Sequence, residues 1–180
     1  DESERVEART PATDKLTELQ AQLNEKIDDL SYLSEDEKNA LKQEAALAVS
    51  KGVETIESAS NSAEIASAEK EADYSLNAII EKAFVANKTA EDTQKNQLNA
   101  DVRGKAGALI SKIDEAAYLS EKEKSSLKQQ VEDAVVDFAT ALSTAKTRED
   151  LTAAAEAGNK ALETIEAEFD AQEVGLARAA

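Results

Sequence analysis

The chain of 180 residues is long enough for one ordinary domain or two small ones, and its 41% hydrophobic content is adequate for packed cores. It has no His, Cys or Met and only 3% aromatic residues, which disfavours the usual general bases, thiolate nucleophiles, zinc sites, disulfides and stacking platforms. A formal net charge of −17 disfavours nucleic acid and anionic membrane surfaces as partners. We therefore predict a protein that is not an enzyme and that uses no cofactor.

The first segment, residues 1–13, places Pro11 among acidic and polar side chains and is predicted to be a disordered lead-in. Because the chain starts at Asp1 and not at a Met, we interpret it as a fragment of a longer protein. No apolar run approaches the roughly 20 residues that a membrane span needs, so no membrane insertion is expected.

An internal repeat organises the rest of the chain. The segment YLSEDEKNALKQE (32–44) has a near copy, YLSEKEKSSLKQQ (118–130), and the two tyrosines are 118 − 32 = 86 positions apart. This distance, hereafter the repeat offset, holds without a gap on both sides of the motif, for example from Leu23 to Leu109 and from Leu76 to Leu162. The apolar positions are kept while the positions between them have drifted. The pattern predicts two copies of one folded unit, residues 14–86 and 100–173.

Each copy contains three helical segments. In the first copy, apolar residues at three- and four-residue steps predict a helix from about Asp14 to Leu30. A second helix is predicted to begin after Ser34, and a third after Asn61, with Thr147 as the equivalent cap in the second copy. Three amphipathic helices with short connections pack most simply as an antiparallel three-helix bundle.

The corner before the second helix has the same sequence features in both copies. A Ser-x-x-Glu segment fits the capping box, in which the Ser side chain and the Glu side chain each accept from the other residue's backbone amide. A Tyr precedes each cap, and we expect its ring to close the end of a bundle, with recognition of a partner as the alternative. The predicted corner and capping residues are Tyr32, Ser34, Glu37, Tyr118, Ser120 and Glu123.

The connector, residues 87–99, is polar and contains no Pro. One interpretation is a single helix from about Ser62 to Ala116, roughly 80 Å long at about 1.5 Å per residue. The alternative is a short break near Thr89 to Asn96. Residues 174–180 are predicted to fray. The expected fold is all-α, with two tandem antiparallel three-helix bundles in an elongated arrangement, and the long shared helix remains an open alternative.

Carboxylate pairs one helical turn apart, Glu69 with Asp73 and Asp133 with Asp137, are candidates for a hard cation. The chain has neither the calcium loop with its central Gly nor a Glu-x-x-His pair, and such carboxylates are common on solvated helix faces, so we predict no metal site. Exposed faces of the second and third helices are the most plausible partner-binding surface. No exposed apolar stripe in the sequence singles out one face, and the partner-binding residues stay unknown.

The pattern Tyr-Leu-Ser-Glu-x-Glu-Lys-x-x-Leu-Lys-Gln, with AKTREDL at 145–151 and GNKALETI at 158–165, resembles the three-helix repeats of Gram-positive cell-surface proteins. These are the FIVAR and GA-type modules and a related helical repeat of unknown function in wall-anchored adhesins. The resemblance covers residues 15–170. It implies a location on the cell wall and a partner such as an extracellular-matrix protein, an immunoglobulin or another plasma protein.

Three functions follow as hypotheses. The first is a non-enzymatic repeat module of a secreted, cell-wall-anchored bacterial protein, monomeric and elongated, that acts in adhesion or as a stalk or spacer. The second is a dedicated binding module for a host extracellular or plasma protein. The third is an intracellular helical scaffold.

Overall fold

A computed structural model describes the backbone of residues 2–180 and the side chains of residues 7–180. Over this range the chain forms helices joined by short loops and contains no strand, which confirms the prediction of an all-α fold. The helices are α1 (Glu2–Asp28), α2 (Glu35–Glu57), α3 (Ser62–Asp114), α4 (Glu121–Thr144) and α5 (Arg148–Ala179).

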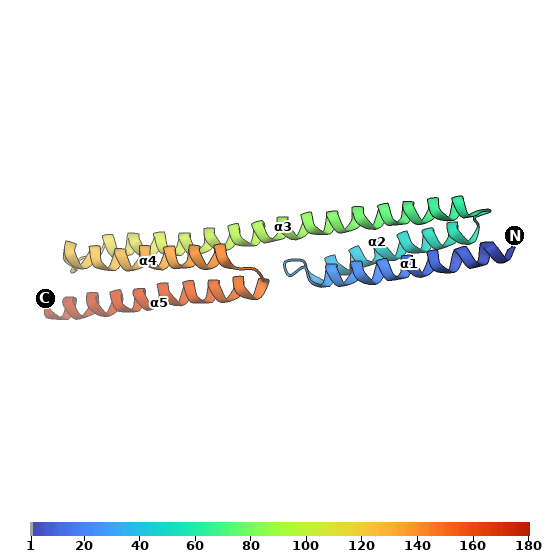
Figure 1. The fold of residues 1–180 in the computed structure, drawn as a ribbon. Helices are drawn as coiled ribbons and strands as arrows, with labels where there is room; N and C mark the ends of the chain where they lie inside the picture. Colours follow the sequence, from blue (N-terminus) through green and yellow to red (C-terminus); the bar gives the residue numbers. More distant parts are fainter. Residues whose placement is uncertain (1) are drawn as a thin grey trace. The chain divides into compact units, whose positions relative to one another are not determined.

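The chain divides into two compact units, Asp1–Ala90 and Glu91–Ala180, hereafter the first and the second unit. In the first unit α1 and α2 lie alongside the first part of α3, and in the second unit α4 and α5 lie alongside its remaining part (Figure 1). α3 is one uninterrupted helix, so the break considered near Thr89 to Asn96 is absent from it. Each unit is described separately below.

In the first unit, all three helices contribute to one apolar core. A Cβ atom added to Gly52 of α2 would lie 2.9 Å from both the Ala72 Cβ of α3 and the Leu16 Cδ1 of α1. The absence of a side chain at Gly52 therefore lets the three helices meet at this layer. The fully buried large side chains of this core are Leu16, Ile27 and Ile56.

In the second unit, the equivalent layer is built from residues of different size. The repeat offset places Phe138 of α4 at the position of Gly52, and Gly158 of α5 at the position of Ala72. A Cβ atom on Gly158 would lie 2.9 Å from the Phe138 Cδ2, so the ring packs directly on the glycine. The bulky residue thus stands on the second helix and the smallest on the third. The fully buried large side chains here are Val102, Ile113, Leu127, Val131 and Leu151.

The N-terminal part of α1 differs from the sequence-based expectation. α1 begins at Glu2 and contains Pro11, where a disordered lead-in is predicted for residues 1–13; residue 1 lies outside the described residues. Ala12 is only 4% exposed, and Arg9 Nη2 donates a hydrogen bond to the Ala59 carbonyl oxygen at 2.8 Å. These contacts offset the helix hydrogen bond that Pro11 cannot make. At the other end, α5 continues to Ala179, through the residues predicted to fray.

Candidate functional site

The predicted capping residues begin the second helix of each unit. In the first unit the Glu37 amide donates to Ser34 Oγ at 3.1 Å and the Ser34 amide donates to Glu37 Oε1 at 3.3 Å, which completes a capping box. In the second unit the Glu123 amide donates to Ser120 Oγ at 3.2 Å, and that hydroxyl donates to Glu123 Oε1 at 3.0 Å. Here Ser120 caps the helix as predicted, but the reciprocal bond from its own amide is not formed, so of the two predicted boxes only the first is complete. These bonds satisfy backbone groups that a helix start leaves without helical partners.

A side chain from the third helix closes the same corner. Asn87 Oδ1 accepts a hydrogen bond from the Tyr32 amide at 3.0 Å. Glu173, which the repeat offset places at the position of Asn87, accepts with Oε1 from the amides of Ala117 and Tyr118 at 2.9 and 3.1 Å. The role is conserved between the units, although an amide has been replaced by a carboxylate.

A lysine of the second helix binds the carbonyl end of the first helix in both units. Lys38 Nζ donates to the Asp28 carbonyl oxygen at 3.0 Å, and Lys124 Nζ donates to that of Asp114 at 2.9 Å. Cations at this position complement the partial negative charge of a helix C-terminus. The same aspartates also form ion pairs with a second lysine, Lys42 in the first unit and Lys128 in the second.

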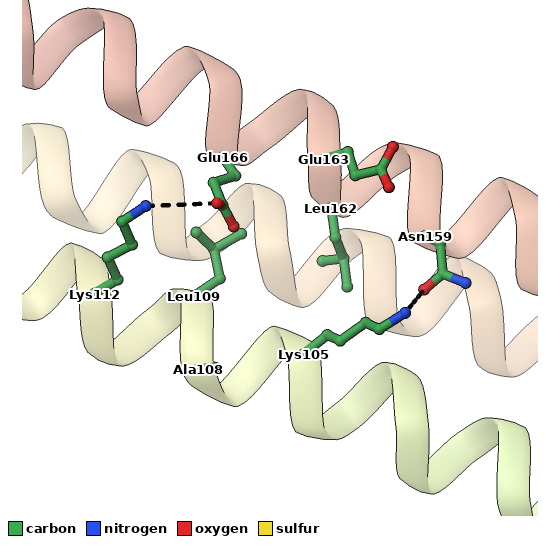
Figure 2. Close-up of a pocket in the computed structure, with 8 residues that line it drawn as sticks. All are labelled: Lys105, Ala108, Leu109, Lys112, Asn159, Leu162, Glu163 and Glu166. Atoms are coloured by element: carbon green, nitrogen blue, oxygen red, sulfur yellow. Dashed lines mark hydrogen bonds and ion pairs between the residues drawn. The ribbon is translucent and has the colours of Figure 1, made fainter.

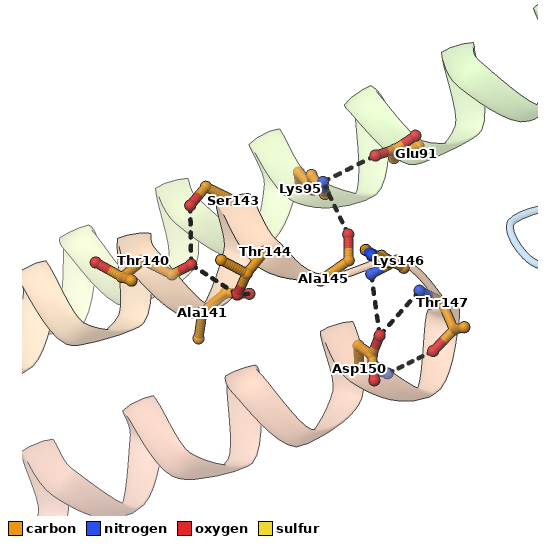
Figure 3. A network of polar contacts seen from close by, with 10 residues as sticks. All are labelled: Glu91, Lys95, Thr140, Ala141, Ser143, Thr144, Ala145, Lys146, Thr147 and Asp150. Atoms are coloured by element: carbon orange, nitrogen blue, oxygen red, sulfur yellow. Dashed lines mark hydrogen bonds and ion pairs between the residues drawn. The ribbon is translucent and has the colours of Figure 1, made fainter.

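The opposite corner repeats its contacts as well. Lys95 Nζ donates to the Ala145 carbonyl oxygen at 3.4 Å and pairs with Glu91 Oε1 at 2.8 Å (Figure 3). The repeat offset maps this bond onto the one from Arg9 to Ala59 in the first unit. Residues 9–13 are therefore part of the repeated unit, which explains why α1 starts before Asp14.

The start of α5 is stabilised by a second capping box (Figure 3). The Asp150 amide donates to Thr147 Oγ1 at 3.1 Å, and Asp150 Oδ2 accepts from the amides of Lys146 and Thr147 at 3.0 and 3.2 Å. The bond from the Lys146 amide is the largest cause of a lowered pKa at Asp150, because these donors favour the charged carboxylate. In the first unit Asn61 Oδ1 accepts from the Glu64 amide at 2.9 Å.

The two corner tyrosines, predicted to be equivalent, are not. Tyr32 is 2% exposed, whereas Tyr118 is 49% exposed. The repeat offset shows a relevant exchange on the third helix, where Ala83 of the first unit becomes Phe169, a buried ring, in the second. Phe169 lies one helical turn before Glu173, which binds the Tyr118 amide. The third helix of the second unit thus differs from that of the first close to the corner that Tyr118 occupies.

A groove between α3 and α5 of the second unit is crossed by polar side chains (Figure 2). Lys105 Nζ donates to Asn159 Oδ1 at 3.0 Å, and Lys112 Nζ lies 3.5 Å from Glu166 Oε1 and 3.1 Å from Asp170 Oδ1. The pKa of Lys112 is raised, first by its bond to Asp170. A partner entering this groove of about 280 Å³ would have to break these contacts.

A second groove, between α4 and α5, is larger and more apolar. Its volume is about 650 Å³, and the buried side chains of Phe138 and Ile165 lie at its base with Gly158. Among residues 7–180, no hydrogen bond or ion pair joins the two helices across it. We call it the α4/α5 groove. Its other lining residues are Gln130, Asp133, Ala134, Asp137, Ala141, Ala154, Ala157, Lys160, Ala161 and Thr164.

The equivalent groove of the first unit, between α2 and α3, is nearly closed. Its volume is about 70 Å³, and Lys82 Nζ of α3 pairs with Glu44 Oε1 of α2 at 2.9 Å. The repeat offset maps every lining residue onto one of the α4/α5 groove. Those of the first unit are Ala48, Lys51, Gly52, Thr55, Ala68, Glu71, Ala72 and Ser75, and their counterparts are Ala134, Asp137, Phe138, Ala141, Ala154, Ala157, Gly158 and Ala161.

Sequence reasoning about single stripes missed this groove, but the repeat contained a signal for it. Thr55, Glu71 and Ser75 of the first unit each become Ala in the second. Read together at the repeat offset, these exchanges mark one face that carries fewer polar side chains in the second unit.

The carboxylate pairs named as cation candidates have protein partners. Glu69 Oε1 pairs with Lys15 Nζ at 3.0 Å, and Asp133 Oδ1 accepts from Gln129 Nε2 at 3.0 Å. Within the described part of the chain, no group of three or more His, Cys, Asp and Glu side chains is placed to hold a metal ion. A search of the same residues finds no helix with the length and apolarity needed to cross a membrane.

Comparisons of the chain with protein-family models, with curated proteins and with solved structures find no match.

Proposed function

We propose that the chain is a non-enzymatic helical repeat module, two tandem antiparallel three-helix bundles, that serves as an elongated stalk or spacer or contributes to adhesion in a bacterial surface protein. The observation that carries this proposal is the recurrence of the corner contacts at the repeat offset. Three kinds of contact recur. Asn87 and Glu173 accept from the corner amides. Lys38 and Lys124 donate to the carbonyl end of a helix, and Arg9 and Lys95 donate to an Ala carbonyl oxygen.

What the two units have in common is therefore architecture, since the contacts that repeat fix helix ends and corners. The grooves, by contrast, differ in volume and polarity. A module retained for its length needs its fold repeated and tolerates change on its faces. A module retained for one chemical site would be expected to repeat that site, which is not the pattern seen here.

Placement at the cell surface is supported by composition and by the resemblance of the repeated motif. The chain has no Cys to be oxidised, and its net charge of −17 favours solubility in a crowded layer. The spacer role implies a monomer, and the resemblance implies an extracellular-matrix or plasma protein as the partner.

Small-angle scattering combined with sedimentation velocity tests the spacer role. We expect a monomer whose maximum dimension exceeds that of a compact globule of equal mass. A radius of gyration of about 16 Å, as compact single domains of this length have, would refute the spacer role.

Antibody labelling tests the location in the organism that encodes the chain. Labelling of intact cells is expected, and signal confined to the cytosolic fraction would favour the intracellular scaffold. Saturable binding to fibronectin, fibrinogen or immunoglobulin at micromolar concentration would favour adhesion over a purely mechanical role.

A further inference from the structure

We propose that the α4/α5 groove of the second unit is a docking site for an amphipathic helix of a partner protein. The partner helix would present small apolar side chains to the groove and Lys or Arg along the edge that meets α4. This inference does not rest on the proposed spacer role, because a stalk and a binding module could both carry such a site.

The shape of the groove fits a helix. Its lining on α5 runs from Ala154 to Ile165, which spans about 16 Å or three helical turns at about 1.5 Å per residue. Phe138, Gly158 and Ile165 at the base are buried, whereas Ala157 on the wall is exposed. Small wall residues let a partner helix approach closely, and helix-in-groove recognition uses anchors at this spacing.

The first unit provides an internal comparison. At the same positions its α2/α3 groove has about 70 Å³ in place of about 650 Å³. The ion pair of Lys82 with Glu44 joins its two helices, but the repeat offset places Glu168 and Gln130 there in the second unit. The second unit thus lacks this bridge and has Ala at three polar positions of the first-unit wall, while both units make equivalent corner contacts.

The charges at the rim indicate the chemistry of the partner. Asp133 and Asp137 are exposed one turn apart on α4, and Lys160 is exposed on α5. No ion pair is recorded for Asp137 or Lys160 among the described side chains. Basic residues on the partner would therefore face α4, and the net charge of −17 would steer such a partner toward the chain. The two rims differ in sign, which also fixes which edge of the partner meets α4.

The neighbouring groove is a weaker candidate. Bonds from Lys105 to Asn159 and from Lys112 to Glu166 cross the α3/α5 groove (Figure 2). Docking a helix there would break these bonds, and the helix would contact fewer apolar residues than in the α4/α5 groove. The α4/α5 groove requires no such loss.

The test uses the full chain and a stapled helical peptide of about 20 residues, with Ala and Leu on one face and Lys along its edges. Nuclear magnetic resonance titration of the isotope-labelled chain follows the methyl groups of Ala141, Ala157 and Ala161. We expect saturable shifts at these groups and none at Ala48 and Ala68, two methyl-bearing residues that line the groove of the first unit. A peptide with Glu in place of Lys should bind at least about tenfold more weakly.

Two variants separate the contributions of charge and shape. Asp133→Asn with Asp137→Asn should weaken binding of the Lys peptide about fivefold to tenfold and reduce its salt dependence. Gln130→Glu with Glu168→Lys rebuilds the bridge of the first unit at the Gln130 end of the groove and should weaken binding of the Lys peptide. Glu115→Gln with Glu132→Gln removes the same charge outside the groove and should leave the affinity within about twofold. Circular dichroism confirms that each variant is folded.

Several results would overturn the proposal. The absence of saturable shifts would do so, as would equal shifts in both units, which indicate adsorption to an acidic surface. Equal affinity for the Glu peptide would exclude the stated chemistry. Sedimentation velocity without peptide covers the remaining occupant: a concentration-dependent dimer that Gln130→Glu with Glu168→Lys abolishes would assign the groove to a second copy of this chain.

Discussion

The two units solve the same packing problem with different residues. At one core layer the first unit combines Gly52 with Ala72, and the second combines Phe138 with Gly158. The small residue has moved from the second helix to the third, and the space above it is filled from the opposite side. The same layer is therefore filled from different helices in the two units, and residue size is not kept at either position.

The polar corners follow the opposite rule. There equivalent positions bind equivalent backbone groups in both units, because a backbone N–H or C=O of fixed position can be satisfied only by a partner placed within hydrogen-bond distance. Even the change from Asn87 to Glu173 keeps a side-chain oxygen at the corner. The comparison teaches that positional constraint is strongest where backbone groups are satisfied and weaker in the apolar core. The predictions below test this difference.

The largest effect is expected from Phe138→Ala. Removing the buried ring above Gly158 leaves a cavity and should destabilise the second unit by about 3 to 5 kcal/mol. Hydrogen exchange of backbone amides should show the loss in α4 and α5 and not in α1 and α2. Adding Gly158→Leu should restore part of the stability by filling the layer from the third helix. A loss spread evenly over both units would contradict the separate cores.

A smaller loss is expected from Gly158→Ala. The new Cβ atom would lie 2.9 Å from the Phe138 Cδ2, and overpacking of about 1 to 3 kcal/mol should exceed the gain of about 1 kcal/mol in helix propensity. Gly107→Ala is the matched control, since no atom lies within 4 Å of its added Cβ. That variant should stabilise the chain by about 0.5 to 1 kcal/mol. Thermal denaturation followed by circular dichroism measures both, and stabilisation by Gly158→Ala would show that the layer is not full.

The caps of α2 and α4 should contribute less than this core layer. Ser120→Ala with Glu123→Ala should cost about 1 to 2 kcal/mol, and Ser34→Ala with Glu37→Ala a similar amount. Hydrogen exchange in the first turns of α4 and α2 reports the change. If either pair of substitutions left exchange unaltered, the corresponding helix start would not depend on its cap.

The smallest effect on stability is expected from lowering the pH. The pKa of Asp150 is lowered in the folded chain, so its contribution to stability is complete above the unfolded pKa and is lost as the pH falls through the folded pKa. We expect the second unit to lose stability below about pH 4. The Asp150→Asn variant should lose less over the same range, as measured by thermal denaturation between about pH 2 and pH 6. Indistinguishable pH profiles would contradict a role for this carboxylate.

Local signals in the sequence were sufficient for much of the fold. Ser34, Ser120 and Thr147 cap helices in the structure because capping depends on residues three positions apart. The apolar stripes identified the buried faces because side chains three and four positions apart lie on the same face of a helix. Before Asp14 the helical pattern is weak, and Pro11 with the surrounding acidic residues favours disorder. Aligning Arg9 with Lys95 at the repeat offset extends the first unit toward the N-terminus.

The features that sequence reasoning did not find depend on distant residues. The motif around Tyr118 is nearly the same as that around Tyr32, so nothing in it signals that Tyr118 is exposed and Tyr32 is buried. The α4/α5 groove likewise arises from exchanges on two helices at once. Neither stripe alone shows it, because each stays apolar in both copies.

The corner acceptors also set an order of events in time. Asn87 lies 55 residues after Tyr32, and Glu173 lies 56 residues after Ala117. When the ribosome has released only α1 and α2, the turn between them still lacks its acceptor, and the hairpin should open and close freely. The turn gains its acceptor when Asn87 emerges from the ribosome. By then the ribosome has already begun α3, the helix to which the second unit also contributes residues. Each unit should therefore close late and all at once during translation.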